Sequence, residues 1–186
     1  DLYWRYKAGL VYLGAILVAC SLLIMVGLLS DPDMMRQTMS AEKWFVLSAL
    51  LAPIGYVLQD AVADAMTVEA VPKFDDAGQP IEAKLQRSMH TTMQTLGRVA
   101  LIGGGVIVAF VNVILLDGVQ DLPKDQQAAV YSKIYMLALI IPLVSIIGVT
   151  LAGHLRRRAR NRLRAQNLSE EEIRRRTEGQ SEKPKV

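Results

Sequence analysis

Four long apolar blocks limit what this chain can fold into. They cover residues 8–29, 43–70, 91–116 and 129–153, and most of the charged residues lie between or after them. A helix needs about 20 mostly apolar residues to cross the hydrocarbon core of a bilayer, where only helices and closed barrels satisfy their backbone groups. None of the blocks shows the alternation of apolar and polar residues that a barrel strand requires. The sequence therefore predicts an all-α integral membrane protein with four transmembrane helices.

Residues that break or cap helices mark the ends of the blocks. The Asp-Pro-Asp sequence at 31–33 is expected to end the first helix, and Ser40 is placed to cap the second. Pro53 lies inside the second helix and Pro142 inside the fourth, and we expect a kink near Pro53 and Gly55. The connecting loops are expected at residues 30–43, 72–88 and 117–127.

Glycines in the first and third helices allow neighbouring helices to approach closely. The first helix contains Gly9, Gly14 and Gly27, and the third contains three glycines at 103–105. These three do not form a phosphate-binding loop, since no strand precedes them and they lie in the membrane. Cys20 is the one cysteine and has no partner for a disulfide or a metal site, so we expect a small packing residue.

The first residues of the chain are typical of the interior of a longer protein. Asp1 is not an initiator methionine, and residues 3–7 are expected to form a loop that leads into the first helix. The first apolar block is too long for a signal peptide, and no cleavage site follows it. We therefore expect a fragment or a trimmed chain.

The distribution of basic residues predicts the orientation in the membrane. Short loops that are rich in lysine and arginine stay on the cytoplasmic side. The N-terminal residues, the middle loop and the C-terminal segment share one side and carry sixteen Lys and Arg residues, whereas the other two loops with their flanks carry four. Both termini are therefore expected in the cytoplasm, and we expect the inner (plasma) membrane of a bacterium as the location.

The chain is expected to divide into a four-helix membrane segment at 1–155 and a basic cytoplasmic segment at 156–186. The basic segment holds 11 of the 21 Lys and Arg residues and begins with three arginines at 156–158. The stretch 169–176 starts with a capping box and predicts a short amphipathic surface helix. The simplest interpretation is an anchor for the topology, and a site for anionic lipid is the alternative. Nucleic acid is not expected as a partner, because no aromatic residues lie among the basic ones.

Ionisable residues inside a membrane helix are costly and by default have a function. Asp60 and Asp64 lie four residues apart in the second helix, so both are on one face. Tyr56 and Thr67 fall near the same stripe, and Glu69 lies on nearly the opposite side, close to the cytoplasmic end. We predict that the stripe lines a pathway for substrate or protons, and that Glu69 is a structural charge at the cytoplasmic border.

Two residues of the third helix lie at the same depth as the aspartates. If the chain crosses the membrane surface near residues 70 and 88, Asp60 and Arg98 are both about 15 Å deep. Asp64 and Gln94 then also share one level, and we predict the pairs Asp60 with Arg98 and Asp64 with Gln94. A buried carboxylate alone tends to take up a proton, whereas one beside an arginine stays charged until the arginine moves. The alternative is a structural ion pair that locks two helices together.

Patterns that are typical of enzymes are missing from the sequence. His90 and His154 lie at the membrane borders and do not have the spacing of a metal site. Asp60 and Asp64 lack the further acidic residues that hold divalent ions for phosphoryl or prenyl transfer. We expect no enzymatic activity, no catalytic residue, no metal and no cofactor.

The segment from Asp60 to Glu69, Asp-Ala-Val-Ala-Asp-Ala-Met-Thr-Val-Glu, is the most specific pattern in the chain. It resembles the fourth membrane helix of the folate–biopterin transporter family in the major facilitator superfamily. That helix has an aspartate, a second aspartate four residues later and a glutamate five residues after that. Three other segments look like parts of the same family: residues 4–7 with Gly9 and Gly14 (entry to helix three), 94–105 (helix five) and the residues after Gly153 (central loop).

The resemblance implies that the chain corresponds to helices three to six of a twelve-helix fold. It implies a secondary transporter, a symporter that moves a small anionic solute of the folate or pterin kind with protons. Asp60 and Asp64 would belong to the transport pathway and Glu69 to the cytoplasmic border. The expected partners are the lipid bilayer, the solute and the remaining helices, because four helices do not form a complete transport path. The alternative function is a non-transporting membrane subunit or assembly factor of a larger membrane complex.

Overall fold

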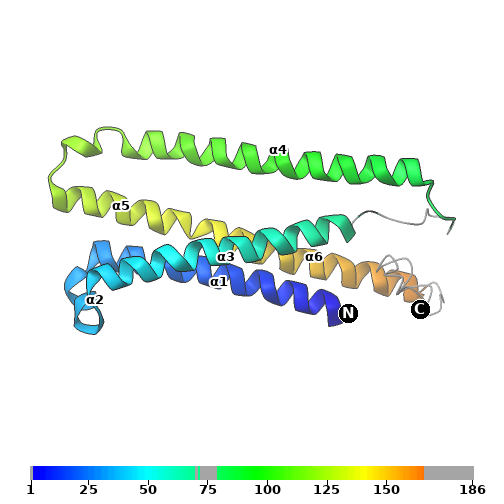
Figure 1. Ribbon diagram of the computed structural model, residues 1–186, viewed down its shortest axis with the longest axis horizontal. Coiled ribbons are helices and arrows are strands. Elements are labelled where there is room, and N and C mark those ends of the chain that lie inside the picture. Colours follow the sequence, from blue (N-terminus) through cyan, green and yellow to red (C-terminus); the bar gives the residue numbers. More distant parts are fainter. Residues whose placement is uncertain (1, 70, 72–78, 166–186) are drawn as a thin grey trace. The chain divides into compact units, whose positions relative to one another are not determined.

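Helices make up nearly all of the described chain (Figure 1). The computed structural model describes residues 2–69, 71 and 79–165, without the side chains of residues 2–5 and 67–69. Within these residues no strand is found, and the all-α prediction is confirmed. In chain order the elements are α1 (Leu2–Ser30), α2 (Pro32–Thr38), α3 (Ala41–Glu69), α4 (Ala83–Leu116), the 3-10 helix η1 (Val119–Asp121), α5 (Lys124–Ala138) and α6 (Ile140–Ala165).

Four stretches of these helices are long and apolar enough to cross a membrane. They are Tyr6–Ser30, Ala41–Met66, Ala83–Asp121 and Lys124–Ala165, with lengths of 25, 26, 39 and 42 residues. Each exceeds the roughly 20 residues that a bilayer requires. The prediction of four membrane-spanning helices is confirmed to this extent for the described part of the chain.

All four predicted helices begin earlier than predicted, α3 at Ala41 and α5 at Lys124, and the shifts are larger for α1 and α4. α1 begins at Leu2, so the expected loop at 3–7 is helical. α4 begins at Ala83, so the end of the expected loop at 72–88 also belongs to a helix, and residues 72–78 of that loop lie outside the described residues. Hydropathy locates the part of a helix that crosses the membrane, but the helix continues until its backbone hydrogen bonds are interrupted. No proline or glycine interrupts residues 2–8 or 83–91.

The predicted loop at 30–43 contains the short helix α2. α1 ends at Ser30 as predicted, and Asp31 then caps α2 by accepting a hydrogen bond from the Met34 backbone N–H at 3.0 Å. Pro32 occupies the first position of α2, where its missing N–H costs nothing. The same Asp-Pro sequence therefore ends one helix and starts the next. A hydrogen bond of 3.0 Å from the Trp44 indole N–H to the Met35 carbonyl connects α2 to α3.

α3 begins immediately after Ser40, at the place that the capping prediction gives. The Ser40 carbonyl accepts the first helical hydrogen bond, from the Trp44 backbone N–H at 3.1 Å. Pro53 lies inside the helix, which continues to Glu69.

The fourth predicted helix is confirmed as one long apolar span, Lys124–Ala165, but the structure interrupts it at Leu139. α5 ends at Ala138 and α6 begins at Ile140. Pro142 has no N–H to donate to the Ala138 carbonyl, and its ring crowds that carbonyl, so the α-helical hydrogen bonds cannot continue. A tighter bond from the Leu139 N–H to the Met136 carbonyl at 3.2 Å closes the end of α5. The prediction of one continuous helix through Pro142 does not include this interruption.

The C-terminal boundary of α6 also differs from the prediction. The helix continues through the three arginines at 156–158 and ends at Ala165. These arginines are therefore helical and continue the helix that contains the apolar stretch before them. The short helix predicted at 169–176 lies outside the described residues.

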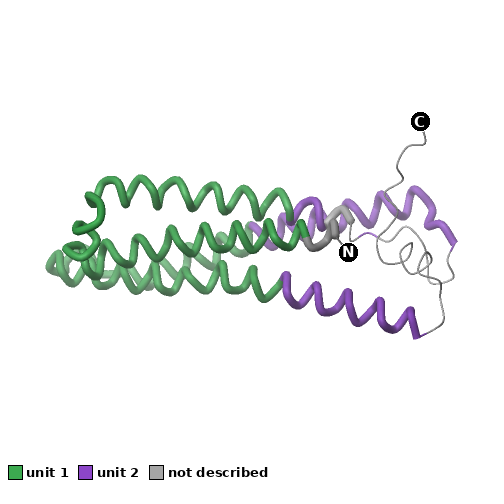
Figure 2. The backbone as a smooth tube through the Cα atoms, turned by 90° about the horizontal axis from the view of Figure 1, so that it is seen from below, with its two compact units in different colours: residues 1–62, 102–148 green, residues 63–101, 149–186 purple. Residues whose placement is uncertain are grey.

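The chain forms two compact units, and α3, α4 and α6 each contribute to both (Figure 2). The first unit contains residues 1–62 and 102–148, and the second contains 63–101 and 149–186. In the first unit α1 contacts α2 and α5, and the hydroxyls of Ser30 and Ser132 share a hydrogen bond of 2.8 Å between α1 and α5. Val11 and Ala15 of α1 are buried there. In the second unit Val71 is the buried residue among those described.

Candidate functional site

Small residues bring α1 and α3 into close antiparallel contact in the first unit. A Cβ atom added to Gly14 would lie 2.7 Å from the Gly55 carbonyl oxygen, and one added to Gly55 would lie 2.6 Å from the Gly14 carbonyl oxygen. A second contact lies two helical turns away from the glycines, toward the end of α1 and the start of α3. There the Ser21 hydroxyl donates to the Ser48 carbonyl at 2.8 Å, and the Ser48 hydroxyl donates to the Ser21 carbonyl at 3.0 Å. Both serines are buried. This face of α3 is therefore fixed against α1.

Gln59 continues the packed face of α3 by one turn. Its Cγ atom would lie 2.8 Å from a Cβ added to Gly14, which places it at the contact between the two helices. Its Oε1 accepts a hydrogen bond of 3.4 Å from the Ser145 hydroxyl of α6. The Nε2 atom is buried, and no hydrogen-bond partner for it is found in the described part of the chain. Gln59 thus connects α3 to α6 within the first unit.

The aspartates lie on a different face of α3. At 3.6 residues per turn, Asp60 and Asp64 are about 120° and 160° around the helix from Ser48, at the centre of the packed face. Both aspartates are exposed, and Tyr56 is also exposed. Within its own unit neither carboxylate has a hydrogen bond or a salt bridge to another described residue. The side chains of Thr67 and Glu69, which were predicted on the same stripe and at the border, lie outside the described side chains.

The two predicted pairs between α3 and α4 differ in whether their members belong to the same compact unit. Asp60 belongs to the first unit and Arg98 to the second, so their pairing stays a prediction. Asp64, Gln94 and Arg98 belong to the second unit, and all three are exposed. No hydrogen bond joins Asp64 to Gln94 among the described residues of that unit.

The hydroxyls that surround Gln94 are satisfied within α4 itself. The Thr91 hydroxyl donates to the Arg87 carbonyl at 3.0 Å, and the Thr95 hydroxyl donates to the Thr91 carbonyl at 2.9 Å. Threonines in helices often donate a hydrogen bond to the carbonyl four residues earlier. These two hydroxyls therefore need no hydrogen-bond acceptor from another helix.

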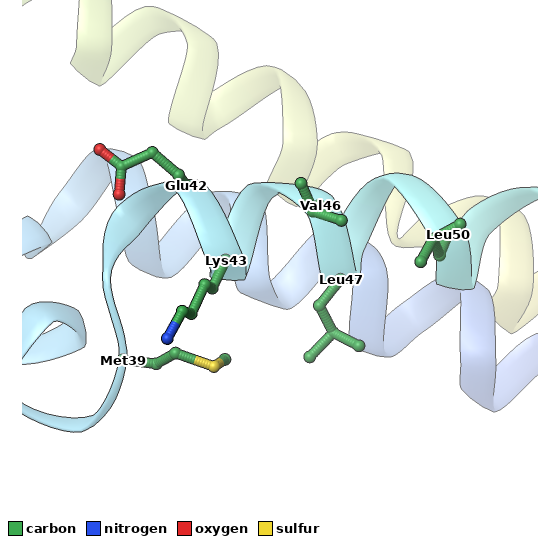
Figure 3. A pocket seen from close by; sticks show the side chains of 6 residues that line it. All are labelled: Met39, Glu42, Lys43, Val46, Leu47 and Leu50. Carbon is green, nitrogen blue, oxygen red and sulfur yellow. The ribbon is translucent and has the colours of Figure 1, made fainter.

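The first half of α3 borders an open hollow of about 420 Å³ (Figure 3). Its side chains are mostly apolar, and Figure 3 shows Lys43 and Met39 on one side of α3 with Glu42 pointing away from them. The hollow contains neither aspartate. It is lined by Met39, Glu42, Lys43, Val46, Leu47 and Leu50. A wide apolar hollow without fixed polar groups does not orient a polar solute, so we do not assign the substrate site to it.

The glycine and cysteine predictions have different outcomes. Gly14 makes the close helix contact that was expected, and Gly27 lies against Met35 of α2, whose Sδ would be 3.0 Å from an added Cβ. Gly9 and the glycines at 103–105 have no such neighbour within 4 Å. Cys20 is exposed, so its interpretation as a packing residue is wrong for the described chain. No group of three or more His, Cys, Asp or Glu gathers in the described ranges.

The residues that hold α1 and α3 together are not among the predicted site residues. These residues are Ser21, Ser48, Gly55, Gln59 and Ser145. The signal was present, because Gly14 and Ser21 are seven residues apart in one helix, and Ser48 and Gly55 are seven apart in the other. Small residues at this spacing form one stripe on each helix and favour close packing in membranes. No protein family model matches the chain, and no curated protein or solved structure is significantly similar to it.

Proposed function

We propose that this chain is part of a secondary active transporter of the major facilitator type. In this proposal it moves a small anionic solute of the folate or pterin kind together with protons across a bacterial inner membrane, with both termini in the cytoplasm. The observation that carries the proposal is the division of α3 into two faces. One face is fixed against α1 through Ser48 and Gly55, and another presents Asp60 and Asp64 without a partner in their own units.

An ionised side chain in the hydrocarbon core costs several kcal/mol unless it faces water or a polar partner. Asp60 and Asp64 lie within the apolar span Ala41–Met66. A helix with one face packed and two carboxylates on another is the arrangement that a water-filled pathway requires. Protons bind to carboxylates reversibly, so these two side chains supply the sites that coupling to a proton gradient needs.

A non-transporting membrane subunit or assembly factor is the second candidate function. α4 favours it, since none of its described residues is buried, although the helix spans Ala83–Leu116. Partner proteins would then cover α4 and neutralise the aspartates of α3. The transporter proposal assigns the same role to further helices of a single polypeptide.

The intact mass of the native polypeptide, extracted from membranes, distinguishes the two functions. The chain described here has a mass of 20.5 kDa. The transporter proposal predicts a native mass of twice that value or more, because further helices complete the pathway. A native mass equal to that of this chain, together with a stable complex of fixed stoichiometry, would reject the transporter and favour the subunit.

A further inference from the structure

The last ten residues of α6, nearly three turns, concentrate positive charge directly after an apolar stretch. Residues 140–155 contain no Asp, Glu, Lys or Arg, and the helix then continues without a break to Ala165. Six of the final ten helical residues are arginines: Arg156, Arg157, Arg158, Arg160, Arg162 and Arg164. Because the helix is continuous, the side chains of these arginines have fixed angular positions around its axis.

The structure separates the six arginines into two sets. Arg156, Arg160 and Arg164 lie four residues apart, and each takes part in interactions with other groups. Of these three, Arg164 is exposed and lies about 20° around the helix from Arg157. Arg157, Arg158 and Arg162 are exposed. His154 and Asn161 lie between them and are also exposed. At 3.6 residues per turn these last five residues fall within an arc of about 140°, which we call the basic arc: His154, Arg157, Arg158, Asn161 and Arg162.

The basic arc lies at the depth of the lipid headgroups if the apolar part of α6 is in the bilayer. The stretch 140–155 is about 24 Å long, and the end of α5 adds the remaining length of the roughly 30 Å hydrocarbon core. Residues 154–162 then extend over about 12 Å, beginning where the hydrocarbon ends. Guanidinium groups form bidentate hydrogen bonds with phosphate oxygens, and arginine is favoured for this contact over lysine.

We propose that the basic arc binds the phosphates of anionic phospholipids in the adjoining leaflet. Charge complementarity favours this partner, since the arc contains three arginines and no acidic residue. The centre of the arc lies about 170° around the helix from Arg156 and about 130° from Arg160, which take part in other interactions. A single-stranded nucleic acid fits less well, because no Phe, Tyr or Trp for base stacking lies at 154–165. The proposal does not depend on transport and holds equally for a membrane subunit.

Native mass spectrometry of the whole protein in neutral detergent tests this site. Dioleoylphosphatidylglycerol and dioleoylphosphatidylcholine are titrated separately, and the numbers of bound lipids are compared. The test variant is R158Q/R162Q, and the matched control R156Q/R160Q removes the same charge from a side of α6 that is about 160° away. The basic residues of 166–186 remain in both variants and preserve the orientation. If the test variant does not accumulate, R162Q is compared with R160Q.

We expect the wild type to bind phosphatidylglycerol more tightly than phosphatidylcholine, with a preference that weakens as salt is added. The test variant loses at least about tenfold of this preference, since each basic residue near the surface contributes about 1 kcal/mol. The control variant keeps most of it. An equal loss of the phosphatidylglycerol preference in both variants would mean that the arginines act only through their total charge. That result would overturn the proposal. Stronger binding of a 20-nucleotide single strand than of phosphatidylglycerol at the same salt concentration would also overturn it.

Discussion

If the chain belongs to a proton-coupled transporter as proposed, we expect Asp60→Asn and Asp64→Asn each to abolish proton-driven solute uptake, while the protein still folds and inserts into the membrane. Asparagine keeps the size and hydrogen-bonding capacity of the side chain but cannot be protonated or carry charge. Neither carboxylate makes a hydrogen bond or salt bridge in its own unit of the described chain, so their replacement removes no contact that packs α3 there. The measurement is uptake of radiolabelled folates and pterins by proteoliposomes that contain the native polypeptide, under an imposed pH gradient. Uptake by both variants is expected to fall to the level of protein-free liposomes.

Glu42→Gln is the matched control for this experiment. Glu42 is an exposed carboxylate in the first turn of the same helix, at the opposite end of the span from Asp64. This variant is expected to transport at the wild-type rate. Wild-type uptake by Asp60→Asn and Asp64→Asn would remove these residues from the pathway. Loss of a stable complex with other proteins, in place of loss of uptake, would favour the subunit function.

Gly55→Ala separates α1 from α3 and destabilises the protein. The new Cβ atom would lie 2.6 Å from the Gly14 carbonyl oxygen and 2.9 Å from Cγ2 of Val18. The nearest atom belongs to the backbone of α1, so the helices must move apart, which also strains the paired hydrogen bonds of Ser21 and Ser48. Overpacking of this kind costs typically 1–3 kcal/mol. The loss is measured as a lower midpoint of thermal unfolding for the protein in detergent.

Gly9→Ala provides the control, because an added Cβ at Gly9 has nothing within 4 Å. Alanine is also the better helix former, so the midpoint of this variant is expected to stay the same or to rise slightly. Equal destabilisation by both substitutions would mean that the close contact at Gly55 does not hold the helices together. Gly14→Ala should reproduce the effect of Gly55→Ala, since its Cβ would meet the Gly55 carbonyl oxygen at 2.7 Å.

Hydropathy and helix-breaking residues predict much of this fold. The apolar blocks locate the four spans, and the Asp-Pro-Asp sequence correctly ends α1 at Ser30. The ends of helices are less predictable, because α4 and α6 continue far beyond their apolar parts as long as their backbone hydrogen bonds are made. The division between α5 and α6 could also be predicted from the sequence, because Pro142 has no N–H to donate to the carbonyl four residues earlier.

The packed face of α3 is harder to predict from the sequence than its polar face. Asp60 and Asp64 are recognisable by charge alone, since few residues of that kind occur in a membrane span. Ser48 and Gly55 are ordinary residues in such a helix, and their role depends on the matching pair Ser21 and Gly14 in α1. The relation becomes clear only when the two helices are aligned antiparallel. Contacts between aspartates and α4 depend on rotation and register, which depth within the membrane does not specify.

Water access to the aspartate face of α3 tests the central claim most directly. Tyr56 and Ile54 provide a matched pair, since they lie at similar depth, are 56% and 52% exposed, and point to sides of the helix that differ by about 160°. Tyr56→Cys and Ile54→Cys are made in a Cys20→Ser background and treated with a membrane-impermeant thiol reagent in intact and inverted vesicles. Tyr56 lies about 40° around the helix from Asp60 and Ile54 about 120°, whereas Asp64 lies about 80° from both. If the side of α3 that carries Asp60 lines a water-filled pathway, Tyr56→Cys reacts and Ile54→Cys does not. Failure of Tyr56→Cys to react from either side of the membrane, or equal reaction of both variants, would contradict the transport pathway.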